Sequence, residues 1–167
     1  MPRPTPRPSR TLAPPGTRDP RQGADDAVTT GPVSDAVERL QAGHRAIIAL
    51  LARGPRALGP LTEALRRHAE EEQEVFHPAL RRAAGREMAA RVTESVRQHR
   101  VIERLLGDLG GLPTGPGRRQ RFEELGARIE EHFRDTESSV FPEALRKLSR
   151  PERLALGERM DLLGQPR

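Results

Sequence analysis

Residues 58–82, LGPLTEALRRHAEEEQEVFHPALRR, decide the fold of this chain. Residues spaced three or four apart form a regular seam, which lies on one face of an α-helix. The seam consists of Leu58, Leu61, Leu65, His68, Glu72, Val75 and Ala79. A histidine and a glutamate, one helical turn apart, thus occupy positions that face a protein core. The stretch predicts a long amphipathic helix whose buried face carries polar donor groups.

Three further segments, residues 33–53, 85–109 and 118–147, repeat this pattern. Each has one histidine near the middle of its apolar seam. These histidines are His44, His99 and His132. Ala, Leu, Arg and Glu dominate all four segments and favour helix formation. Short connections with Gly and Pro suit antiparallel neighbours. The chain is therefore predicted to be all-α, an antiparallel up-down four-helix bundle.

The two ends of the chain differ from this pattern. Ser149 and Glu152 match a capping box, which predicts a short fifth helix over one end of the bundle. Residues 1–32 hold eight of the 16 prolines and predict a disordered tail rich in Pro and Arg. A start codon assigned too far upstream and docking of an unidentified partner are alternative explanations of the tail. The folded domain is expected to span residues 33–167, with Ser34 as the N-cap of its first helix.

Composition excludes several classes of protein. The net charge is +5, but acidic and basic residues alternate along the helices, which indicates solvated faces rather than a nucleic-acid site. The absence of cysteine excludes disulfides, thiolate metal sites and thiol catalysis. No stretch approaches the ~20 apolar residues of a membrane helix, and the N-terminus lacks the apolar region of a secretory signal. We expect a cytoplasmic protein with neither a membrane nor a nucleic-acid partner.

The four seam histidines are the main functional signal. A single buried histidine is usually a hydrogen-bonded core residue. Four that meet in one bundle interior would repel each other when protonated, and each would need partners for two ring nitrogens when neutral. A metal cation satisfies both conditions, because neutral imidazole is a common metal ligand.

Carboxylates accompany three of these histidines. Glu72 and Glu103 each follow a seam histidine by one turn and point the same way. Glu137 follows its histidine by five residues, a wider offset that a flexible side chain can bridge. Each pair alone is a weak signal in helices rich in Arg and Glu. Because buried carboxylates are costly without a cation, their convergence with the histidines predicts a metal site.

These motifs resemble those of one known family. They are HAEEEQEVFHP at residues 68–78, QHRVIE at 98–103 and HFRDTESSVFP at 132–142, together with His44. The set resembles the hemerythrin or HHE cation-binding family, whose four-helix bundles hold a non-haem di-iron centre. The segment LSRPERLALGERM, residues 148–160, also resembles the closing helix of these proteins. The resemblance covers residues 33–163.

The resemblance implies a di-iron centre with seven ligands. They are His44, His68, Glu72, His99, Glu103, His132 and Glu137. The first two histidines would bind one iron, and the last two would bind the other together with Glu103. Glu72 and Glu137 would bridge the ions. The implied cofactor is two iron ions, Fe²⁺ or Fe³⁺, with a bridging oxo or hydroxo group.

Glu103 departs from the pattern of the oxygen-carrying members, which have a second histidine there. A carboxylate is a harder, negatively charged donor and favours ferric iron. This departure argues against reversible oxygen carriage and favours sensing or redox chemistry. The alternative is that Glu103 lies on the surface of its helix.

Five other residues in the motifs are given lesser roles. His77 lies nine residues after the histidine of its helix, about 180° around the axis, so we expect it to face away from the site. Thr136 lies on its seam and can hydrogen-bond a ligand. Asp135 is an alternative metal ligand to Glu137. Pro78 and Pro142 are expected to kink or end their helices.

The leading hypothesis is a di-iron protein that binds or senses dioxygen, peroxide or nitric oxide. One alternative is a di-iron enzyme that decomposes peroxide or repairs iron–sulfur clusters. Repair proteins in the family usually carry a cysteine-bearing N-terminal segment, and this chain has no cysteine. Iron storage or scavenging is another alternative. A bundle stapled by Zn²⁺ is disfavoured, because zinc prefers four ligands and this site offers about seven.

Overall fold

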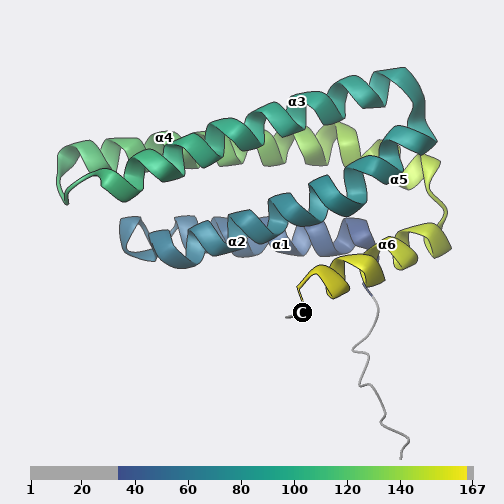
Figure 1. The fold of residues 1–167 in the computed structure, drawn as a ribbon, viewed down its shortest axis with the longest axis horizontal. Coiled ribbons are helices and arrows are strands. Elements are labelled where there is room, and N and C mark those ends of the chain that lie inside the picture. Colours follow the sequence, from purple (N-terminus) through teal and green to yellow (C-terminus); the bar gives the residue numbers. More distant parts are fainter. Residues whose placement is uncertain (1–33, 165–167) are drawn as a thin grey trace, which may run out of the picture. The chain divides into compact units, whose positions relative to one another are not determined.

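The computed structural model describes residues 34–164, which belong to one compact unit, Pro32–Arg167. The predicted tail, residues 1–32, lies outside the described residues. Every regular element among those described is helical. The helices are α1 (Ala36–Leu51), α2 (Leu58–Glu71), α3 (His77–Gly111), α4 (Pro116–Asp135), α5 (Phe141–Lys147) and α6 (Arg150–Leu163) (Figure 1). Between them lie the 3₁₀ turn η1 (Pro55–Ala57) and the π-helical turns η2 (Glu72–Phe76) and η3 (Thr136–Val140).

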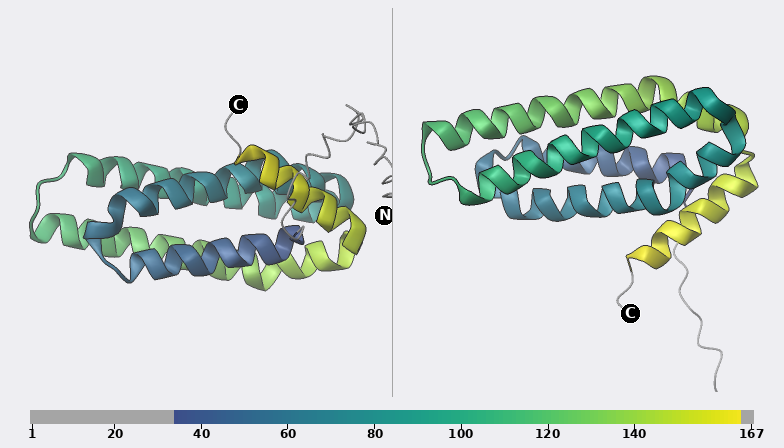
Figure 2. Two further views of the ribbon diagram at one scale, coloured as in Figure 1. Left: turned by 90° about the horizontal axis from the view of Figure 1, so that it is seen from below. Right: turned by 45° about the horizontal axis from the view of Figure 1, so that its top comes forward.

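The long helices lie side by side as a bundle (Figures 1 and 2). α2 continues through η2 into the first part of α3, and α4 continues through η3 into α5. α3 is interrupted at Gly85, whose φ of 73° and ψ of −164° are not helical. A positive φ favours glycine because glycine has no Cβ. This break at Gly85 lies at the predicted boundary between the helical segments of residues 58–82 and 85–109.

Two apolar clusters fill the interior of the bundle. One includes Val37, Leu40, Phe76, Met88, Val92 and Phe141. The other includes Ile47, Leu65, Ile102, Leu125, Ile129 and Phe133. Along each of the long helices, the seam histidine falls between residues of the first cluster and residues of the second. The polar layer is thus surrounded by apolar side chains, which strengthens electrostatic interactions within it.

α6 lies against the start of α1. It begins with the capping box predicted for Ser149 and Glu152. A Cβ on Gly157 would lie 1.8 Å from the carbonyl oxygen of Ser34, so the contact between the two helices requires glycine. Leu156 belongs to the first apolar cluster. α6 therefore covers one end of the bundle, as expected for a closing helix.

The N-cap of α1 is Asp35. Its side chain accepts a hydrogen bond of 2.9 Å from the backbone N–H of Val37. Its other carboxylate oxygen lies 2.6 Å from Nε of Arg153 on α6. The prediction that Ser34 is the cap was wrong by one residue, because the Asp35 carboxylate caps the helix and binds α6 at once.

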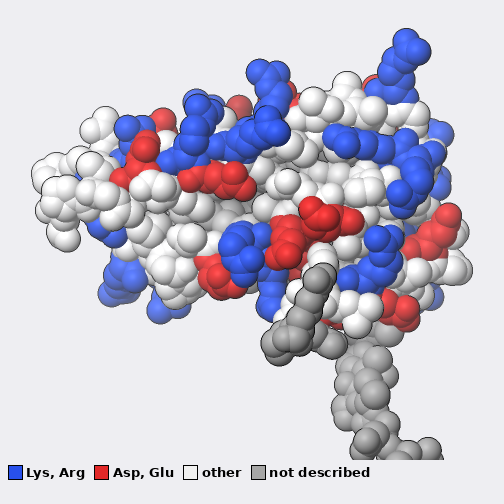
Figure 3. Space-filling model, in the orientation of Figure 1, with Lys and Arg blue, Asp and Glu red and all other residues white. Residues whose placement is uncertain are grey.

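The surface carries charges of both signs. Figure 3 shows basic and acidic side chains mixed over the face in view. Several are paired one turn apart along a helix, such as Arg66 with Glu63 and Arg128 with Glu131. Within residues 34–164, no helix has the length and apolar character needed to cross a membrane.

Candidate metal centre

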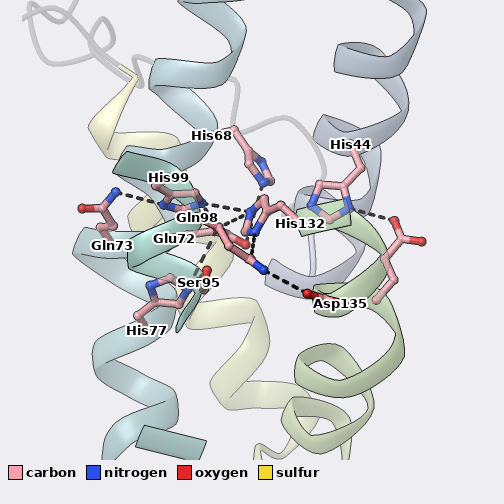
Figure 4. Close-up of polar contacts among 11 residues, drawn as sticks. His44, His68, Glu72, Gln73, His77, Ser95, Gln98, His99, His132 and Asp135 are labelled. Atoms are coloured by element: carbon pink, nitrogen blue, oxygen red, sulfur yellow. Dashed lines mark hydrogen bonds and ion pairs between the residues drawn. The ribbon is translucent and has the colours of Figure 1, made fainter. Parts of the chain in front are cut away.

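The bundle consists of four helical rods: α1, α2 with η2 and the first part of α3, the rest of α3, and α4 with η3 and α5. Five polar residues from these four rods meet in the layer between the apolar clusters (Figure 4). They are His44 on α1, His68 on α2, Glu72 in η2, His99 on α3 and His132 on α4. All five are buried, and Glu72 has no exposed surface. The sequence predicted each of them as a ligand, and the structure brings them together.

The five residues form two triads that share Glu72. His44, His68 and Glu72 make one, and Glu72, His99 and His132 make the other. Within each triad the donor atoms all lie within 4.8 Å of one another. We call these the His44 half-site and the His99 half-site.

The two oxygens of Glu72 face different half-sites. Oε1 lies 3.7 Å from Nε2 of His68. Oε2 lies 2.9 Å from Nε2 of His99 and 3.6 Å from Nε2 of His132. A single carboxylate is thus placed where it can donate one oxygen to each of two cations.

Among the inward-facing atoms, Nε2 of His99 and Nε2 of His132 lie within hydrogen-bond distance of each other at 2.9 Å, and the others lack hydrogen bonds. Nε2 of His44, both nitrogens of His68 and both oxygens of Glu72 are buried without a hydrogen-bond partner among the described residues. Leaving such atoms unpaired costs about 1–3 kcal/mol each. A bound cation would satisfy them, so the donor set fits a metal centre.

The protonation states also suit a metal. Burial lowers the pKa of His44 to about 4 and that of His68 to about 3. Burial acts to raise the pKa of Glu72, but the neighbouring histidines, His68 foremost, outweigh it and hold that pKa well below its usual range. These imidazoles are therefore neutral and the carboxylate is ionised near neutral pH, the forms that bind metal ions.

Outer hydrogen bonds fix two of the imidazoles on the α3–α4 side. Nδ1 of His132 lies 2.9 Å from Oε1 of Gln98, whose amide nitrogen donates to Asp135 at 2.9 Å. Nδ1 of His99 lies 3.0 Å from Nε2 of Gln73, an amide nitrogen that donates, so a metal bound through Nε2 of His99 requires this amide to present its oxygen instead. Both rings therefore turn Nε2 toward Glu72. Asp135 is not brought to the triads; it holds Gln98 instead.

Glu137 lies outside both triads. Its side chain is 49% exposed, and Oε1 lies 2.7 Å from Nδ1 of His44. A carboxylate that accepts the outer N–H of a metal-binding histidine fixes its tautomer and orientation. The structure thus places Glu137 as the outer partner of His44, and its role as a bridging ligand remains a prediction.

Glu103 is also outside the triads. It is exposed on α3, at the mouth of a cavity of about 430 Å³. Leu65, Ile102, Leu106 and Phe133 line this cavity, which reaches His68, His99 and His132. The alternative position on the helix surface, which the sequence left open, is the observed one, and ligation by Glu103 remains a prediction.

The expectation that His77 faces away from the site was wrong. The side chain is buried, and Nε2 lies 3.9 Å from Oε2 of Glu72. The cause is η2, in which the N–H of His77 bonds to the carbonyl of Glu72, five residues earlier. A π-helical turn adds one residue without adding a turn, so it rotates all that follows by roughly 100°.

A signal for this turn exists in the sequence. Pro78 lacks an N–H, and its ring would clash with the carbonyl of Glu74 in a regular helix. A wider turn before the proline relieves that clash. The same arrangement recurs where η3 precedes Pro142. Each proline lies ten residues after a seam histidine, so the pair marks both π-helical turns.

Comparison with known proteins gives one match. The family described as "Hemerythrin HHE cation binding domain" matches residues 34–144. This range includes all five residues of the two triads. Searches of the curated proteins and of the solved structures gave no match.

Proposed function

The chain belongs to the hemerythrin HHE cation-binding family, and from this we propose that its two half-sites hold a pair of iron ions that binds or senses dioxygen, peroxide or nitric oxide. One observation carries the proposal. Glu72 is fully buried, with one oxygen facing the His44 half-site and the other facing the His99 half-site. That arrangement suits two adjacent cations better than one.

The donor chemistry supports iron. The triads offer four imidazoles and a carboxylate, a mixed nitrogen and oxygen set without sulfur. Structural zinc sites are usually closed by four ligands at one ion. The up-down order of the helices and the oxo or hydroxo group between the ions are also part of this proposal.

The surrounding residues suit a small, weakly polar ligand. Iron in the half-sites would supply redox chemistry and a coordination position for such a ligand. The cavity of about 430 Å³ gives access from the surface to His68, His99 and His132. Its apolar walls, which include Ile102 and Phe133, disfavour charged solutes and admit small neutral molecules.

The test is the iron content of the purified chain after anaerobic reconstitution. We expect about two irons per chain, lost together in Glu72→Gln because this one carboxylate serves both half-sites. Glu74→Gln is the matched control, since Glu74 is exposed on the same turn. Iron well below one per chain in the wild type, or full retention in Glu72→Gln, would contradict the proposal.

Absorption spectra of the reduced protein then separate the functions. A spectral change that follows dioxygen or nitric oxide and reverses on its removal supports binding or sensing. Sustained turnover of added peroxide would instead identify a redox enzyme. Labile iron whose spectrum responds to no small ligand would identify storage.

A further inference from the structure

His77 is a fifth histidine beside the metal centre. It is the first residue of α3 and is 3% exposed. Its Nε2 faces Oε2 of Glu72 at 3.9 Å, and its ring lies parallel to that of His99 with centroids 6.1 Å apart. Figure 4 shows the ring beside Ser95 and below His99.

We propose that His77 is a further ligand of the His99 half-site, binding through Nε2. This inference rests on the proposed function, because it assigns a donor to the same ions. With His77, the half-site has three imidazoles and one carboxylate oxygen, all from buried residues.

The spacing of the donor atoms supports ligation. Donors bound to one ion at about 2.1 Å lie about 3 Å apart when adjacent and about 4 Å apart when opposite. The distance of 3.9 Å between His77 Nε2 and Glu72 Oε2 falls within this range. His77 belongs to neither triad, so its imidazole would have to turn toward the ion for Nε2 to bind together with Glu72 and His99.

The burial of His77 needs a compensating interaction. Its Nε2 has one long hydrogen bond, 3.4 Å to Oγ of Ser95, beside the 3.9 Å contact with Glu72. Its Nδ1 has no hydrogen-bond partner among the described residues and would carry the proton when Nε2 binds a metal. An apolar side chain would fill this place without an unpaired polar atom. A bond from Nε2 to a metal ion accounts for a histidine here.

His77 and Glu103 lie toward opposite ends of the half-site along α3. Ser95 and Glu103 lie one turn before and one turn after His99 on α3. His77 contacts Ser95 and is buried, whereas Glu103 is exposed at the mouth of the cavity. The structure therefore favours the histidine as the additional donor.

The experiment counts bound imidazoles in the Co²⁺-loaded full-length chain by proton NMR. Each imidazole bound through Nε2 keeps an Nδ1–H whose resonance is shifted by the paramagnetic ion and disappears on exchange into D₂O. We expect resonances from His44, His68, His77, His99 and His132 in the wild type. His77→Gln should remove one of them and weaken one of the two Co²⁺ binding steps by at least about tenfold.

The outcomes are separable. A wild type that binds two Co²⁺ but lacks the His77 resonance overturns this inference and leaves the proposed function standing. So does a His77→Gln variant with unchanged spectrum and affinity. A wild type that binds no metal overturns both. Glu74→Gln, an exposed change on the preceding turn, is the control and should leave every resonance in place. If His77→Gln does not fold, the wild-type spectrum alone decides.

Discussion

At the scale of single residues, the orientation of the metal-site histidines depends on hydrogen bonds from neighbouring side chains. The imidazole of His44 is buried, yet its Nδ1 bonds at 2.7 Å to Glu137, which is half exposed. His132 is held in the same way by Gln98, which is held in turn by Asp135. A hydrogen bond to the outer nitrogen leaves the inner nitrogen free to bind a metal. The geometry of the half-sites is thus set partly from the protein surface.

Glu137 gives a prediction at this scale. If it only orients His44, Glu137→Gln should weaken one of two metal-binding steps by about 10–100-fold and leave the other unchanged. Titration of the metal-free protein with Fe²⁺ or Co²⁺, followed by calorimetry, measures both steps. Glu131→Gln is the control, since Glu131 pairs with Arg128 away from the triads. If both steps weaken together, Glu137 bridges the ions, as the resemblance implies.

The scale of helices shows what the sequence could and could not predict. The three- and four-residue spacing located the seams, so His44, His68, Glu72, His99 and His132 were all predicted to converge, and they do. The spacing of apolar residues repeats over many helical turns, so one misassigned position does not change the predicted buried face. The prediction assumes a regular helix, however, and η2 is not regular. The predicted direction of the His77 side chain was therefore wrong, although the directions of the residues before η2 were predicted correctly.

The carboxylates were harder to predict than the histidines. Glu103 has the spacing of a ligand relative to His99, but the helix turns it to solvent at the cavity mouth. Glu137 contacts the centre through His44 rather than through Glu72. Long, flexible side chains reach several positions from one backbone site, so spacing alone does not fix their contacts. Burial decided which carboxylate joins the triads, and only the packed structure gives burial.

The contact between α1 and α2 yields a prediction of its own. A Cβ on Gly43 would lie 3.0 Å from Nδ1 of His68, so Gly43→Ala should push the imidazole out of position. We expect weaker metal binding in the His44 half-site with little loss of helix content by circular dichroism. Gly126→Ala is the matched control, because its Cβ would meet only Leu51 at an ordinary 3.9 Å. Unchanged metal affinity in Gly43→Ala would show that the ring of His68 moves without cost.

At the scale of the whole molecule, α6 joins the end of the bundle to the metal centre through α1. α1 carries His44, and its first turn is held to α6 by the Asp35–Arg153 ion pair and by the close contact at Gly157. All four helical rods also contribute to the first apolar cluster, which includes Leu156 and Met160 of α6. Loss of α6 would therefore loosen the helix that brings His44 to Glu72.

Gly157→Ala tests this coupling. Its Cβ would meet the backbone of Ser34 at 1.8 Å, which no change of rotamer relieves, so α6 or α1 must move. We expect the metal-free variant to lose about 1–3 kcal/mol of unfolding free energy, the usual cost of overpacking. Because metal binds only the folded state, an ion at 100 times its Kd should restore about 2.7 kcal/mol. Chemical denaturation with and without Fe²⁺ measures both quantities. If metal stabilises Gly157→Ala as much as the wild type, the centre is independent of α6; a smaller gain shows that α6 helps to hold His44 in place.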